Sequence, residues 1–135
     1  MKESILLRQV WAAASESGRF WRNNVGVLYD RRGVPIKYGL CPGSSDLIGI
    51  RPQTCPHCGQ WTAGVFTAIE VKMPTARVTP GQQRFLDAVS ALSGIATVAR
   101  DVKDVQVMTK YAIQKRRQEA LTGQVREHEN IIFRD

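Results

Sequence analysis

Residues 65–73 read VFTAIEVKM, and Pro74 follows directly. This apolar run has the length of a β-strand, and side chains on a strand point alternately to the two faces of the sheet. One face of its second half is therefore apolar, while the other carries Glu70 and Lys72. The apolar face consists of Ile69, Val71 and Met73. A carboxylate and an ammonium group are thus expected side by side on one face of a buried strand.

A second strand, predicted over residues 46–50, brings another carboxylate to the same place. Residues 52–64 are rich in Pro, Gly, Cys and polar side chains, which is typical of a hairpin tip. If the strand beginning at Val65 pairs back onto 46–50, Asp46 falls roughly opposite Glu70. A divalent cation relieves the repulsion between two such carboxylates and accepts phosphate oxygens and water as further ligands. A partly exposed salt-bridge network would leave the same pattern.

The remaining elements indicate an α/β protein with a mixed sheet flanked by helices. The order is α-β-β-β-β-α-β-α, with predicted helices over 3–17, from Thr79 to Gly94, and over 102–118. The other predicted strands cover 24–30, 34–39 and 95–100. The sequence Thr79-Pro80-Gly81-Gln82 has the form of a capping box with proline at the first helical position. Residues 1–118 are expected to form one domain, and 119–135 a C-terminal tail that is a candidate part of a dimer interface.

Two polar side chains are expected to point inward from the flanking helices. Glu3 shares the stripe of Leu7, Val10 and Ala14, where an unpaired carboxylate would be costly. An acidic residue is also favoured at any helix N-terminus, which is the simpler interpretation. Gln82 lies on the apolar face of its helix, although a capping-box glutamine needs no other purpose.

The charge distribution suggests a polyanionic partner. The chain carries a net charge of +7, and five basic residues lie between Arg19 and Lys37 against a single acid, Asp30. Aromatic and amide side chains are interleaved with them, a mixture suited to phosphates and sugars. A solvated basic hairpin is the alternative. The candidate DNA contacts are Arg19, Arg22, Asn23, Lys37 and Arg77.

Three stretches in order resemble the VRR-NUC branch of the PD-(D/E)xK nucleases. They are Gly43-Ser44-Ser45-Asp46-Leu47, then Ile69-Glu70-Val71-Lys72, and then Thr79-Pro80-x-Gln82-x-x-Phe85-Leu86. The stretch at 18–23, GRFWRN, is also similar to standalone phage and bacterial members. The resemblance covers residues 3 to about 100, and it implies a restriction-endonuclease-like fold. The proline expected shortly before the first aspartate is displaced here, because Ser44 and Ser45 follow Pro42-Gly43.

The resemblance also implies roles for the site residues. Asp46, Glu70 and the Val71 carbonyl would bind Mg²⁺ or Mn²⁺, and Lys72 would position the attacking water. Glu3 and Gln82 would correspond to the family's acidic residue of the first helix and its helix glutamine. Family members cut DNA to leave 5′-phosphate ends, and the small standalone ones look like dimeric resolvases of Holliday junctions.

The cysteines suggest a second, structural metal. Cys55-Pro56-His57-Cys58-Gly59 looks like half of a zinc knuckle, but a structural zinc ion normally has four ligands. Two subunits could each donate a pair, or His57 and a neighbour could complete the site. A tight turn with spare thiols is the alternative. With three cysteines in all, a secreted disulfide scaffold is not indicated.

The leading hypothesis is therefore a Mg²⁺-dependent endonuclease for structured or branched DNA, acting as a homodimer. The alternatives are a non-catalytic DNA-binding module on the nuclease fold and a zinc-stabilised nucleic-acid adaptor. No run of about 18 apolar residues is present, and the N-terminus lacks the pattern of a secretion signal. A cytoplasmic protein of a bacterial cell or phage-infected host is expected, without a membrane partner.

Overall fold

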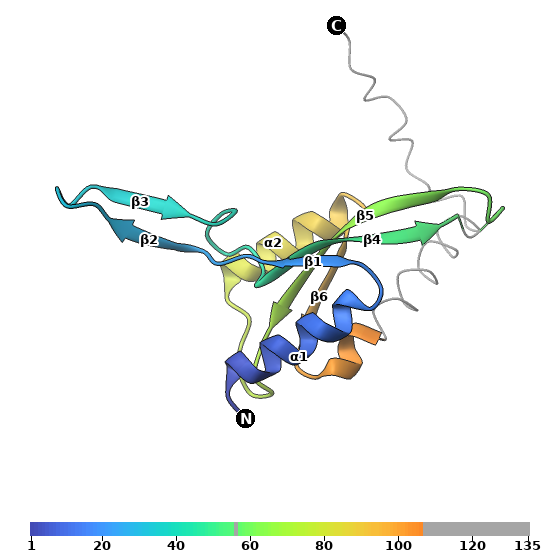
Figure 1. Ribbon diagram of the computed structural model, residues 1–135, viewed down its shortest axis with the longest axis horizontal. Helices are drawn as coiled ribbons and strands as arrows, with labels where there is room; N and C mark the ends of the chain where they lie inside the picture. Colours follow the sequence, from blue (N-terminus) through green and yellow to red (C-terminus); the bar gives the residue numbers. More distant parts are fainter. Residues whose placement is uncertain (56, 107–135) are drawn as a thin grey trace, which may run out of the picture.

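A computed structural model describes residues 1–55 and 57–106 of the chain. Figure 1 labels the helices and strands of this part. In chain order they are α1 (Glu3–Ser15), β1 (Arg19–Arg22), β2 (Gly26–Tyr29), β3 (Pro35–Tyr38), β4 (Leu47–Thr54), β5 (Thr62–Val71), α2 (Pro80–Ala91) and β6 (Ile95–Ala99).

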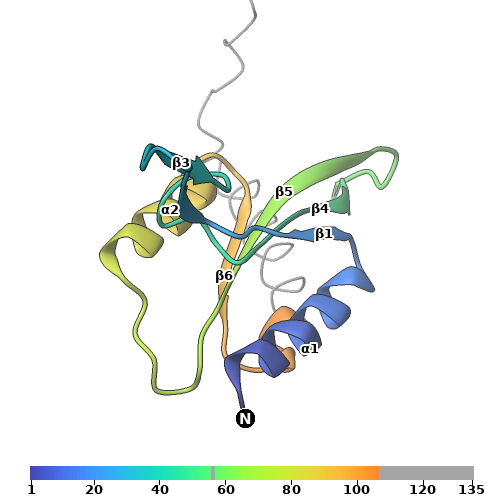
Figure 2. The same cartoon turned by 60° about the vertical axis from the view of Figure 1, so that its left-hand side comes forward.

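The body of the molecule is a four-stranded mixed sheet with strand order β1-β4-β5-β6. The strands β1, β4 and β5 are antiparallel neighbours, whereas β6 runs parallel to β5. The helix α1 covers one face of this sheet and α2 covers the other, as both Figure 1 and Figure 2 show. The predicted α/β class, with a mixed sheet flanked by helices, is confirmed.

The alternation predicted for β5 is confirmed by its packing. Ile69 and Val71 lie in the core that α1 closes, together with Val10, and all three are at most 1% exposed. Ala68 faces the other way, against Leu86 of α2. Burial of this apolar surface on both sides of β5 is the main force that holds the two helices on the sheet.

Two details of the sheet differ from the prediction. The short edge strand β1 was not predicted, because its sequence RFWR shows no clear alternation and buries only Phe20. The hairpin tip is also shorter than 52–64, because β4 continues to Thr54 and β5 starts at Thr62. Pro52 is tolerated inside β4 because the pairing with β1 ends at Ile50, so the missing N–H faces no partner strand there.

Both helices begin as the sequence predicts, but Glu3 does not lie in the core. The stripe of α1 is buried at Leu6, Leu7, Val10 and Ala14. Glu3, in the first turn, is exposed, so the expectation of a buried carboxylate there is wrong. The capping box of α2 is complete, with Thr79 as the N-cap.

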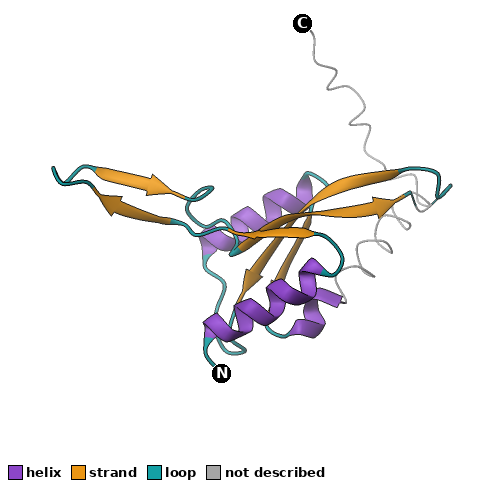
Figure 3. Cartoon of the chain, viewed as in Figure 1, coloured by secondary structure: helices purple, strands orange, loops and turns teal. Residues whose placement is uncertain are grey.

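The strands β2 and β3 form a separate two-stranded sheet that extends away from the body (Figure 3). Its register pairs Leu28 with Ile36 and Val27 with Lys37. All four of these side chains are exposed, so the predicted basic hairpin also carries a large apolar surface. Helical backbone resumes at residues 102–106. The rest of the predicted helix 102–118 and the predicted tail 119–135 lie outside the described residues.

None of the helices in the described part is long and apolar enough to cross a membrane.

Candidate functional site

The Glu70 side chain is buried near the end of β5, with a relative exposure of only 1%. Its Oε1 accepts a hydrogen bond from Gln82 Nε2 at 2.5 Å and lies 3.2 Å from Lys72 Nζ. Its other oxygen, Oε2, is buried and has no hydrogen-bond partner among the described residues. An unsatisfied buried carboxylate oxygen is costly, and this oxygen remains available to a ligand.

Asp46 supplies the second carboxylate, as predicted. Leu47 pairs with Ile69 across β4 and β5, so Asp46 is placed one step further along the same register, beside Glu70. Its Oδ2 accepts a hydrogen bond from the Val71 N–H at 2.8 Å. The structure therefore brings together Asp46, Glu70, Val71 and Lys72 at one end of the β4–β5 hairpin.

Both carboxyl groups titrate above their ordinary range. Burial, with the Asp46 charge nearby, raises the pKa of Glu70 from 4.5 to about 7, although Lys72 opposes the shift. Burial also raises the pKa of Asp46, against the Val71 N–H and Lys72. The charge of Glu3 also raises both pKa values, so this exposed residue of α1 lies near the site. Two coupled carboxyl groups of this kind are typical of functional sites.

Gln82 serves the helix cap and the site at the same time. Its Oε1 accepts the Thr79 N–H at 2.9 Å, closing the capping box. The amide NH₂ must then point the other way, where it donates to Glu70. The inward orientation predicted for Gln82 is confirmed, and the two interpretations of this residue are compatible.

The loop that carries Asp46 is held by Asn23, which was predicted to contact DNA. The Asn23 amide donates to Ser44 Oγ at 2.7 Å and to the Ser45 carbonyl at 2.9 Å, and its oxygen accepts the Leu40 N–H at 3.1 Å. Its backbone N–H donates to the Asp46 carbonyl at 2.8 Å. Its amide is therefore engaged inside the protein, where it positions Asp46, rather than free for a phosphate.

At Gly43 the same loop packs against the start of α2. This glycine has a φ of +83°, and a Cβ there would lie 2.8 Å from the Gly81 backbone. Only glycine fits both requirements. The loop of Asp46 and the helix of Gln82 are therefore in direct backbone contact.

Arg100 is a further positioning residue that sequence reasoning missed. Its Nη1 donates to the carbonyls of Met73 and Ala76 at 2.7 Å and to that of Pro74 at 3.2 Å. It thereby fixes the turn that follows Lys72. The sequence gives no sign of this role, because arginine at a strand end is ordinarily solvated.

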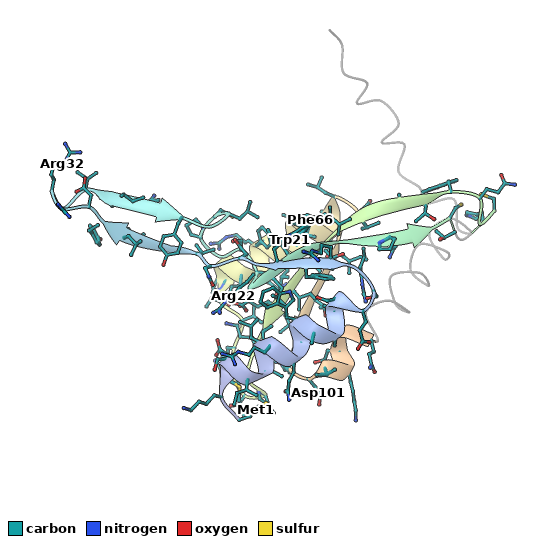
Figure 4. All side chains as sticks on the ribbon, viewed as in Figure 1. Met1, Trp21, Arg22, Arg32, Phe66 and Asp101 are labelled. Atoms are coloured by element: carbon teal, nitrogen blue, oxygen red, sulfur yellow. The ribbon has the colours of Figure 1, made fainter. Side chains whose placement is uncertain are left out.

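The other predicted DNA contacts lie at different distances from the site. Arg22 is exposed and lowers the pKa of Asp46 through its charge, so it borders the carboxylates. Figure 4 shows Arg22 where the β2–β3 hairpin joins the body, and Arg32 at the far end of that hairpin. The remaining candidates, Arg19 on β1, Lys37 on β3 and Arg77 before α2, are all exposed.

Residues 35–103 match the family model of the VRR-NUC domain. The chain belongs to the VRR-NUC family. Its nuclease-type, DNA-acting domain contains Asp46, Glu70, Lys72 and Gln82, all within the matched range. No curated protein and no solved structure shows significant similarity to the chain.

The donor set of this VRR-NUC site suits Mg²⁺, which proteins usually bind through one or two carboxylates while water and phosphate fill the other positions. Among the described residues, no group of three or more His, Cys, Asp or Glu side chains could hold a metal ion. Asp46 and Glu70, with the free Oε2 of Glu70, fit an ion whose other positions are filled by water and phosphate. They do not fit an all-protein cage.

We expect the metal-free protein to lose stability as the pH rises from 4.5 through about 7. In this range the folded chain holds the Glu70 proton more tightly than the unfolded chain, so raising the pH favours unfolding. The loss is on the order of 3 kcal/mol. Urea unfolding of wild type and Glu70→Gln, compared at each pH, measures it. Parallel pH profiles for the two proteins would contradict this prediction.

We also expect Gly43→Ala to destabilise the protein more than Gly33→Ala. Both glycines have a positive φ, at +83° and +80°, so both substitutions carry a backbone cost of about 1–2 kcal/mol. Only at Gly43 would the new methyl group also meet another backbone; at Gly33 nothing lies within 4 Å. Equal unfolding midpoints in urea would show that the contact between the loop and α2 is unimportant.

Proposed function

We propose that the chain is a metal-dependent endonuclease that hydrolyses DNA phosphodiester bonds. The observation that carries the proposal is the buried, unpartnered Oε2 of Glu70 beside the Asp46 carboxylate. Here Lys72 and Gln82 both contact Oε1, which leaves the second oxygen for a ligand.

Asp46 and Glu70 would hold Mg²⁺ or Mn²⁺, with the Val71 carbonyl as a further ligand. Bound there, the ion would polarise the phosphodiester and lower the pKa of a coordinated water. The chain's own residues prepare the site for it. Gln82 and Lys72 fix the Glu70 carboxylate through Oε1, and the Val71 N–H fixes Asp46 through Oδ2.

Lys72 has a second task in this proposal. Its ammonium group is 3.2 Å from Glu70, and its side chain is 16% exposed. A partly exposed ammonium group at the edge of the site can orient a water molecule by hydrogen bonding and neutralise charge on a phosphate oxygen. Glu3, exposed on α1, keeps the local field negative and so favours a cation.

The substrate we propose is structured or branched DNA such as a Holliday junction, cut to leave 5′-phosphate ends. The net charge of +7 and the exposed Arg22 beside the carboxylates support a DNA backbone as the partner. One chain contributes one site, so paired cuts across a junction require two chains, and we propose a homodimer.

We expect cleavage to require Mg²⁺ or Mn²⁺ and to depend on each charged residue of the site. Asp46→Asn, Glu70→Gln and Lys72→Met keep the size of the side chain but remove its charge. Each is expected to reduce the cleavage rate by at least about 100-fold. Asp87→Asn makes the same chemical change on the exposed side of α2 and should leave the rate unchanged.

The assay compares a four-way junction, a flap, duplex and single-stranded DNA, each with Mg²⁺ or EDTA. Fastest cutting of the junction, with products that DNA ligase can reseal, is the expected result. DNA binding without Mg²⁺-dependent cleavage would instead identify a non-catalytic DNA-binding module. Equal cleavage by Glu70→Gln and Asp87→Asn would show that the carboxylates are not the site.

A further inference from the structure

The tip of the β4–β5 hairpin holds two thiols that the nuclease site does not use. Cys55 follows the last residue of β4, and Cys58 lies three residues further along the turn. Cys58 is exposed and Cys55 is half-buried. The Gly59 N–H donates to the Cys55 carbonyl at 3.0 Å, with Gly59 at a φ of +65°, and the Cys55 N–H donates to the Trp61 carbonyl at 2.9 Å. Two thiols are thus presented on a tightly closed turn.

The turn also points backbone N–H groups at one sulfur atom. Those of Cys58, His57 and Gly59 donate to the Cys55 thiol, as does the Cys58 thiol, and together they lower the pKa of Cys55. Such donors stabilise a thiolate, which is the form of cysteine that binds metal. These donors at Cys55 favour a metal-binding thiolate over the alternative of a tight turn with spare thiols.

A single chain supplies only half of a zinc site from its described residues. Structural zinc is almost always tetrahedral with four protein ligands. No third His, Cys, Asp or Glu side chain gathers with the two thiols in this part of the molecule. Cys41 lies in the Asp46 loop, where its carbonyl accepts from Ser44 Oγ at 2.6 Å, at the other end of β4.

The position of the tip allows a second chain to supply the missing ligands. Figure 1 shows the β4–β5 hairpin extending well beyond β1 and both helices. The two cysteines lie at the end of that extension. A two-fold axis through a metal ion would bring together two copies of each thiolate, which makes four ligands in all.

We propose that Cys55 and Cys58 form half of a tetrahedral zinc site that two copies of the chain complete at their hairpin tips. The site is structural and lies apart from the nuclease chemistry. Eight residue pairs of β4 and β5 separate the thiols from the carboxylates, which corresponds to roughly 25 Å at the usual strand rise.

A tip-to-tip pair would hold two nuclease sites far apart, facing different arms of one branched DNA molecule. This consequence rests on the proposed nuclease function, whereas the zinc site does not. The two proposals therefore fail independently: Glu70→Gln should lose cleavage and keep zinc and dimer.

The test uses the full chain, purified under reducing conditions, with zinc content measured by elemental analysis and mass by light scattering. The expected result is one zinc ion for two chains and a dimer that becomes monomeric when zinc is chelated. Cys55→Ser and Cys58→Ser should be zinc-free monomers. The matched control, Cys41→Ser, should keep both zinc and dimer.

Three outcomes would overturn the proposal. One is a reduced protein that takes up no zinc. Another is one zinc ion per monomeric chain, which would mean that the chain completes its own site; loss of that zinc in His128→Ala would identify a ligand beyond the described residues. The third is a dimer that persists in Cys55→Ser, since its contacts would then lie elsewhere. Circular dichroism of each serine variant checks that the fold is intact.

Discussion

The burial of one carboxylate, that of Glu70, is the constraint on which the rest of the site depends. A charged group at 1% exposure is expensive unless its oxygens are satisfied. One oxygen is satisfied by Gln82 and Lys72, while the other is open. The buried Glu70 carboxylate, with the Asp46 carboxylate beside it, therefore destabilises the metal-free protein. A bound cation would remove this repulsion. Two apolar residues in place of Glu70 and Asp46 would stabilise the fold better, so the free energy lost by burying these carboxylates points to a function.

Much of the fold can be understood as support for this arrangement. Asn23 and the contact of Gly43 with Gly81 hold the Asp46 loop against α2, and Arg100 holds the turn beyond Lys72. These contacts involve the backbone of the Asp46 loop, the start of α2 and the turn after Lys72. The buried face of β5 against α1 supplies the stable platform for these polar contacts.

The centre of the site could be predicted from the sequence because strand geometry is simple. Period-two alternation puts Glu70 and Lys72 on one face, and a hairpin register puts Asp46 opposite them. The capping box likewise orients Gln82. The role of Asn23 could not be predicted, because its partners are 17 to 22 residues away and include backbone carbonyls. Glu3 was predicted to be buried but is exposed. Helical periodicity shows which side of the helix a residue is on, but not whether the sheet extends far enough to cover it. The strand β1 was not predicted because an edge strand of four residues shows almost no alternation of apolar and polar residues.

Glu70 has a raised pKa of about 7, and a divalent cation in the proposed site would displace its proton. The titration of its side-chain carboxyl carbon, followed by ¹³C NMR with and without Mg²⁺, tests this most directly. Without metal, the account predicts a pKa of about 7. Saturating Mg²⁺ should lower it by more than about one unit, because the ion binds only the carboxylate form. An ordinary glutamate pKa that does not respond to Mg²⁺ would contradict the account.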